Sequence, residues 1–239
     1  MNFKNSKLVA SLRLDYNKGD AKALSNLFKT LYGDGKAENF NHSLSLGYNK
    51  NLCNHNQLGI WLGRAQRSGS LTERYINRFA VGIDAYELVG NPELKPETNN
   101  QIDLIFTHKK DNIFFQADVF YSYLENYISG VIVPIKPYSM TAPGTRQIQN
   151  IEKAFKTGVE TRFNWQFLPK FRTELAAAYT YAEDIDTNNP LPEIAPLDFR
   201  WNVLADFSPV SLGFHYRYSA KQSRINPTFG EFTTPEFSV

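Results

Sequence analysis

Two segments of this chain carry arginine, glutamate and tyrosine residues close enough in sequence to act together. The first segment holds Arg67, Glu73, Arg74 and Tyr75, and the second holds Tyr138 and Arg146. Guanidinium groups donate charge-assisted hydrogen bonds to anions, and tyrosine rings stack on flat or cationic groups. The six residues are therefore candidates for binding an anionic or aromatic ligand. The alternative is that they only pack one loop against another, since most loop residues bind nothing.

No catalytic arrangement is visible among the nucleophilic and titratable residues. The four histidines are isolated from one another and fall outside the GxSxG, HExxH and CxxC spacings; they are His42, His55, His108 and His215. Cys53 and His55 supply two soft metal ligands, which is half of a tetrahedral site. The sequence therefore predicts a protein that is not an enzyme, with no cofactor and no metal site.

Charge and composition narrow the class of protein. The 239 residues carry 26 Lys and Arg against 24 Asp and Glu, and no basic cluster dominates a segment, so we expect no nucleic-acid partner. Aromatic residues reach 14%, as the aromatic girdles of a membrane protein require. No run approaches the roughly 20 apolar residues of a membrane helix. A membrane protein of this composition would cross the bilayer with strands.

Alternation of apolar and polar side chains is the main structural signal. In the segment 197–207, one face holds Leu197, Phe199, Trp201, Val203, Ala205 and Phe207, and the other holds Asp198, Arg200, Asn202 and Asp206. The segment 6–16 has the same pattern. Strands that are apolar on one face and charged on the other are typical of a membrane barrel with a wet or plugged interior.

Nine such strands can be placed, near 6–16, 40–48, 57–66, 99–109, 113–124, 151–166, 171–182, 197–207 and 210–219. Short turns near 49–56, 110–112, 167–170 and 208–209 alternate with long loops, the first of which could hold a short helix over 21–31. The last residues, 234–239, read as the start of a tenth strand. The fold predicted is all-β: a partial, antiparallel, up-and-down transmembrane β-barrel of about nine to ten strands.

A resemblance to a known family rests on the segment 90–97, Gly-Asn-Pro-Glu-Leu-Lys-Pro-Glu, which precedes an alternating strand. It closely resembles the "GNPxLKPE" segment of TonB-dependent outer-membrane receptors. A weaker match is the strand that contains Asn150, Ala154, Gly158 and Glu160, similar to the "N…A…G.E" strand of the family. Residues 70–75 and 230–235 also look like family segments. Together these matches run from about residue 58 to the C-terminus.

The resemblance implies a plugged barrel of about 22 strands that takes up scarce ligands such as iron–siderophore complexes. We expect residues 1–239 to be the C-terminal portion of that barrel, with the plug domain, the segment gripped by TonB and the last strands outside this sequence. The implied partners are outer-membrane lipid, the TonB complex through the N-terminal part, and a metal chelate or other small ligand. The implied location is the cell outer membrane.

Two other functions stay open at this stage. A passive outer-membrane channel shares the barrel and needs no plug. A soluble β-domain that binds carbohydrate on an aromatic face would bury one face of each strand in a core.

Overall fold

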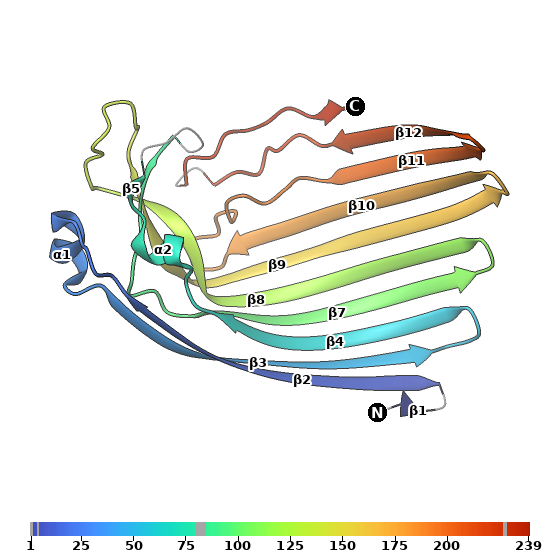
Figure 1. Ribbon diagram of the computed structural model, residues 1–239, viewed down its shortest axis with the longest axis horizontal. Helices are drawn as coiled ribbons and strands as arrows, with labels where there is room; N and C mark the ends of the chain where they lie inside the picture. The colour runs from blue at the N-terminus through green and yellow to red at the C-terminus, as the bar shows by residue number, and fades with distance from the viewer. Residues whose placement is uncertain (1, 4, 80–84, 227–228) are drawn as a thin grey trace.

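The protein forms one curved antiparallel sheet in the computed structural model (Figure 1), which describes all residues except 1, 4, 80–84 and 227–228, with only the backbone described for Asn2, Phe3 and Phe79. Nine long strands lie side by side in chain order: β2 (Ser6–Asp20), β3 (Lys36–Asn51), β4 (Asn56–Arg67), β7 (Glu97–Lys110), β8 (Ile113–Val133), β9 (Thr145–Leu168), β10 (Phe171–Asp184), β11 (Asp198–Phe207) and β12 (Val210–Ser219). These are the nine predicted strands, and the up-and-down order is confirmed.

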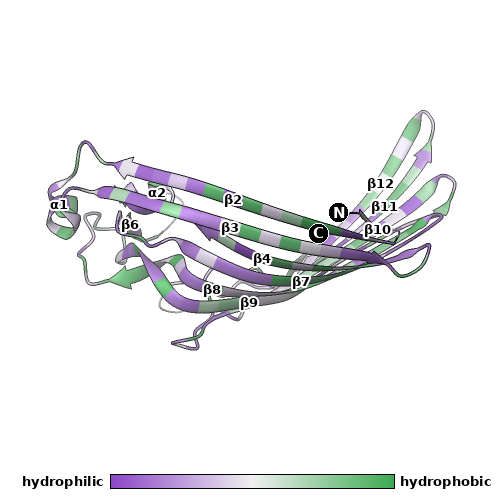
Figure 2. Ribbon diagram, turned by 90° about the horizontal axis from the view of Figure 1, so that it is seen from below, coloured by the Kyte–Doolittle hydropathy of each residue, from purple (hydrophilic) through white to green (hydrophobic). Residues whose placement is uncertain are grey.

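Short elements complete the described chain. β1 (Asn2–Phe3) pairs with β2, and β13 (Phe237–Ser238) pairs with β12 where a tenth strand was predicted. β5 (Asn77–Phe79) pairs with β6 (Glu87–Val89), and β6 adds in parallel to β9. The helices are α1 (Asn26–Tyr32) and α2 (Leu71–Tyr75). The sheet is an open path rather than a closed ring, as expected for part of a barrel (Figure 2).

The strands extend further on one side than alternation predicted. β8 continues to Val133 and β9 begins at Thr145, so residues 134–144 form the loop that was expected over 125–150. At about 3.3 Å per residue, the 24 residues of β9 are more than twice the roughly 9–11 that a tilted strand needs to cross a bilayer. In the surplus residues apolar and polar side chains no longer alternate, as expected where a strand has water on both faces.

The two rims differ as predicted. Figure 1 shows the turns β3–β4, β7–β8, β9–β10 and β11–β12 at one end, and α1, α2 and the long connections at the other. We call the second end the loop rim. α1 lies within the first predicted loop, starting later than the helix expected over 21–31; α2 was not predicted.

Strand register assigns the faces. Val203 pairs with Phe214 and Thr173, and Val159 pairs with Val119 and Tyr179, so the predicted apolar positions form continuous rows on the convex, outward face. Many of these side chains are exposed, including Leu12, Leu44, Leu62, Val119 and Leu212. Such an uncovered apolar surface fits contact with lipid. Asp118, Glu160 and Asp198 fall on the opposite, inward face.

Gly158 is required by close packing on the inward face. A Cβ atom there would lie 2.4 Å from the Tyr179 carbonyl oxygen and 2.7 Å from the Phe120 ring.

The described buried core is small and sits at the loop rim, where Leu124, Ala154 and Ala182 pack with Leu191. The interior is thus lined by polar groups rather than filled by apolar ones.

Val203 tests the assignment of faces. V203R should destabilise the intact barrel by about 2–4 kcal/mol, because it places a guanidinium in the hydrocarbon near the middle of β11. Urea unfolding in lipid vesicles measures this cost. N202R, one residue along on the inward face, is the matched control and should be tolerated. Equal costs at both positions would contradict the assignment.

Candidate functional site

Arg67 ties three elements together at the loop rim. Its guanidinium lies 3.0 Å from Glu73 Oε2 of α2 and 3.0 Å from Glu97 Oε2 of β7. The same Glu97 carboxylate accepts a hydrogen bond of 2.9 Å from the Ile128 backbone N–H of β8. The arginine at the end of β4 therefore holds the loop segment against the two strands that follow it.

α2 is a single capped turn. The Ser70 hydroxyl accepts from the Glu73 N–H at 3.2 Å, and Glu73 Oε2 accepts from the Ser70 N–H at 2.7 Å, which makes a complete capping box. Burial raises the pKa of the Glu73 carboxyl, but hydrogen bonds from Arg67 and the Ser70 N–H outweigh burial, and the net pKa is below its ordinary value.

Arg74 is a buried residue, with 1% of its surface exposed. It donates to Asn17 Oδ1 at 2.8 Å and to Asn39 Oδ1, side chains from β2 and β3. Tyr75 lies against Gly19, where a Cβ atom would meet its hydroxyl. One contiguous group is thus formed by Arg67, Glu73, Arg74 and Tyr75. Its side chains join α2 to β2, β3, β4 and β7 at the loop rim.

The segment 90–97 packs directly on α2. Gly90 lies so close that a Cβ atom would be 2.6 Å from the carbonyl carbon of Arg74. The Gly90 N–H donates to the Ile76 carbonyl at 2.7 Å, and the Asn91 N–H donates to the Glu73 carbonyl at 3.0 Å. Leu94 is buried beside Gly69. Gly90, Asn91 and Leu94 therefore fit this segment to the helical turn that precedes it.

Asn150 joins the two family-like motifs. Its Oδ1 accepts from the Lys95 N–H at 2.9 Å, while its Nδ2 donates to the carbonyls of Lys95 at 3.1 Å and Asn126 at 2.8 Å. Asn126 has φ 54°, the left-handed region that asparagine tolerates. Sequence reasoning singled out both motifs without placing them in contact, because no local pattern encodes a pairing of residues so distant in the chain.

Tyr138 and Arg146 belong to a second group around the β5–β6 hairpin. Tyr138 is 85% exposed, and the Arg78 guanidinium lies 5.7 Å from its ring centroid. Arg146 is 5% exposed and lies between two rings, 4.3 Å from Tyr86 and 3.9 Å from Phe229. Of the six candidates, Tyr138 is the most accessible, whereas Arg146 packs loops together.

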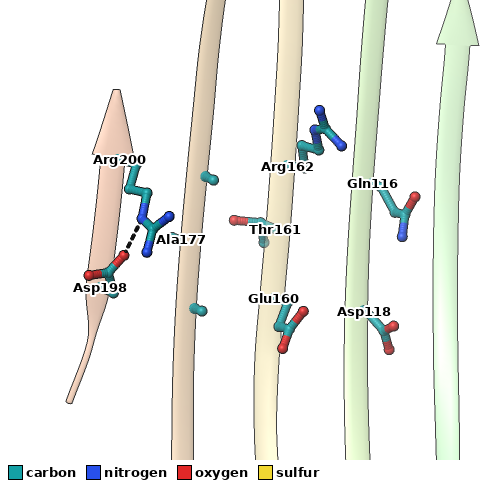
Figure 3. Close-up of a pocket in the computed structure, with 10 residues that line it drawn as sticks. Gln116, Asp118, Glu160, Thr161, Arg162, Ala177, Asp198 and Arg200 are labelled. Carbon is teal, nitrogen blue, oxygen red and sulfur yellow. Dashed lines mark hydrogen bonds and ion pairs between the residues drawn. The ribbon is translucent and has the colours of Figure 1, made fainter. Parts of the chain in front are cut away.

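The inward face carries a cavity of about 320 Å³ lined by charged and polar side chains (Figure 3). Asp118 pairs directly with Glu160 across β8 and β9, and Gln116 pairs with Arg162. On β11, Asp198 forms ion pairs of 2.7 Å with both Arg200 and Arg217. Acidic and basic groups are therefore interspersed over this surface, with the Asp118 and Glu160 carboxylates side by side, which suits polar contacts and water.

Metal ligands are sparse in the described part of the chain, where no group of three or more His, Cys, Asp or Glu side chains is arranged to hold an ion. Cys53 is exposed in the β3–β4 turn, and the rings of His55 and His108 are 6.5 Å apart. Within the same residues, no helix has the length and apolar character needed to cross a bilayer.

A curved antiparallel wall with an uncovered apolar outside, a charged inside and structured loops at one rim defines part of a transmembrane β-barrel. A family model described as "TonB dependent receptor-like, beta-barrel" matches residues 1–239. The chain belongs to this family of outer-membrane barrels, as the resemblance predicted.

Solved structures share the fold at low sequence identity. They include the copper transporter OprC (TM-score 0.79, 20% identity, 99% of this chain and 36% of that one) and the FrpB iron transporter from Neisseria meningitidis, F3-3 variant (0.67, 13%, 99% and 35%). The siderophore receptor PirA from Acinetobacter baumannii is a third (0.65, 17%, 99% and 36%). The chain thus spans about a third of the length of these proteins. No curated protein sequence matches it significantly.

Asn150 is expected to control the order of segment 90–97. N150A should weaken the local structure by about 1 kcal/mol, since it removes the hydrogen bonds that join Asn150 to backbone groups of Lys95 and Asn126. Hydrogen exchange of the Leu94 and Lys95 amides measures the loss. N112A, in the β7–β8 turn at the other rim, is the control and should leave those amides protected. Unchanged exchange in N150A would show that the contact is dispensable.

Glu73 should make the loop rim sensitive to acid. Because its pKa is lower folded than unfolded, its stabilisation is complete above the ordinary value of 4.5 and is lost as pH falls through the folded pKa. Amide protection of residues 70–76, corrected for intrinsic exchange, should fall over that range. In E73Q the free energy that protects residues 70–76 from local unfolding should be lower by about 1 kcal/mol near neutral pH. This variant should also lose most of the pH dependence. An equally steep profile in E73Q would assign the acid sensitivity elsewhere.

Proposed function

We propose that the chain forms part of an outer-membrane receptor for energy-coupled uptake of an iron–siderophore complex or a similar scarce chelate. The observation that carries this proposal is the match of the receptor-barrel family to the entire chain. The described wall adds two supports: a charged inward face, and long loops folded on one another at a single rim. The structural relatives named above handle copper, iron or siderophores.

We further propose that residues 1–239 are the C-terminal portion of a larger barrel, with the plug and the last strands encoded elsewhere. An open sheet in hydrocarbon would leave backbone groups of β2 unpaired, so further strands must complete it. TonB would act through the N-terminal part. The mixed charges around Asp118, Glu160 and Arg162 would face a plug across water and hydrogen bonds.

The six rim candidates would serve ligand capture in two ways. Tyr138, which is 85% exposed, would touch the ligand. Arg67, Glu73, Arg74, Tyr75 and Arg146 would hold the loops that present it. An exposed aromatic ring at the rim suits a chelate with aromatic groups, because the two can stack.

Uptake by cells that produce the intact protein tests the class of transporter. Uptake of a radiolabelled ferric siderophore should require both the protein and TonB. Equal uptake in cells lacking TonB would favour a passive channel. Binding of oligosaccharides by the protein kept soluble without detergent would favour the carbohydrate-binding domain.

Tyr138 tests the proposed ligand contact. Y138A should weaken binding of the transported chelate about three- to tenfold, because it removes one stacking surface. Fluorescence titration of the purified intact protein measures the affinity. M140A is the matched control, since Met140 is a fully exposed neighbour without a ring, and its affinity should be unchanged. If both variants lowered the affinity equally, or if neither did, Tyr138 would not be a ligand contact.

A further inference from the structure

Arg78 has a backbone conformation that arginine rarely adopts. It lies in β5 with φ 49°, in the left-handed region, where the pairing of β5 with β6 shifts register between Asn77 and Phe79. An irregularity of this kind turns a side chain in a direction that regular pairing would not allow. Such a residue costs free energy and persists where the surrounding contacts outweigh the cost. The role of Arg78 should therefore be visible in the contacts of its side chain.

The Arg78 guanidinium contacts the loop 134–144 and a buried carboxylate. Its Nη1 donates to the Lys136 carbonyl at 3.3 Å, and its Cζ lies 5.7 Å from the centroid of the Tyr138 ring. The same Nη1 lies 3.9 Å from Glu87 Oε2. One arginine of β5 thus contacts the backbone of the loop, the exposed ring that the loop carries, and an acidic residue of β6.

Glu87 binds the same loop from β6. Its side chain is 1% exposed, and its carboxylate accepts hydrogen bonds from the backbone N–H groups of Tyr138 and Ser139. The Glu87 N–H donates to the Gly144 carbonyl at 3.1 Å, which fixes β6 to the end of the loop. A buried carboxylate needs donors and a cation to offset its loss of water, and here the loop supplies the donors and Arg78 the cation.

Burial of apolar side chains does not fix the loop 134–144. Each of its residues is described, and each is at least partly exposed, so none belongs to a buried core. Within the loop, the Ser139 and Thr141 hydroxyls bond to each other at 2.8 Å, which orders one turn but does not tie it to the sheet. The contacts from Arg78 and Glu87 therefore decide where the Tyr138 ring lies.

We propose that Arg78 and Glu87 are positioning residues, which hold the loop 134–144 in the arrangement in which Tyr138 meets the ligand. The inference rests on the proposed receptor function, in which Tyr138 is the ligand contact. A loop that is ordered before the ligand arrives loses less conformational entropy on binding, so the two residues raise the affinity without touching the ligand. The Arg78 guanidinium also restrains the Tyr138 ring, because a cation is attracted to the face of an aromatic ring.

Hydrogen exchange of the intact protein without ligand tests the anchoring of the loop. E87Q keeps the size of the side chain and removes its charge, so the Tyr138 and Ser139 amides, corrected for intrinsic rates, should exchange about fivefold faster. R78Q should accelerate the same amides about twofold, since Glu87 loses its cation. R64Q is the matched control, because it removes an arginine that is ion-paired on β4 instead, and it should leave these amides unchanged.

A double-mutant cycle tests whether Arg78 acts through Tyr138. The probe is a ferric tris(catecholate), a chelate with aromatic rings, titrated into the purified intact protein. R78Q should raise its Kd about threefold when Tyr138 is present, and should cause no further loss when combined with Y138A. R78K keeps the cation and should restore most of the affinity. R64Q should bind the probe as the unmodified protein does.

Three results would overturn the proposal: unchanged exchange of the Tyr138 and Ser139 amides in E87Q, an equal acceleration in R64Q, or a loss of affinity from R78Q that is as large in the Y138A background as without it. The exchange measurement needs no ligand, so it separates this proposal from the receptor function. If the variants exchange faster but the unmodified protein binds no catecholate, the aromatic chelate is rejected as the ligand. That result would also end the role of the two residues in binding and leave only their anchoring of the loop.

Discussion

Backbone hydrogen bonding in a solvent without water is the constraint on which the rest of this structure depends. A strand in hydrocarbon must pair on both sides, so each of the inner long strands lies between two antiparallel neighbours. The register of this pairing fixes side-chain direction: a shift by one residue would turn Asp118 and Glu160 toward lipid and Val119 and Val159 toward the interior. Pairing and side-chain alternation therefore enforce each other.

The loops at the loop rim need another source of stability, because they lie in water and have only a small apolar core. Its order comes from groups that each join several elements. Arg67 connects β4, α2 and β7; Arg74 connects α2 to β2 and β3; Asn150 connects β9 to segment 90–97. Of these three residues Arg74 is the buried one, and losing a partner of a buried polar contact costs more than the contact contributes. The three residues give the loops one arrangement where burial alone would allow many.

The same strands carry functions at three surfaces without interference. Their inward side chains form the mixed-charge surface of Figure 3, their outward side chains form the lipid-facing rows, and their extensions beyond the membrane support the loops. Alternation makes the first two independent, since neighbouring residues point to opposite faces. Length makes the third possible, since β8 and β9 continue well past the bilayer.

The sequence by itself determined the nine long strands, the order of turns and loops, the inward and outward faces and the family, because alternation is local and the bilayer imposes it on every crossing strand. It did not reveal how far β2, β8 and β9 extend, since no solvent contrast exists above the membrane to maintain alternation. It also placed Arg74 and Arg146 among ligand candidates without revealing that both are buried. Only the tertiary structure decided that, and the pairing of Lys95 with Asn150, because partners from distant segments meet only after the sheet has set their positions.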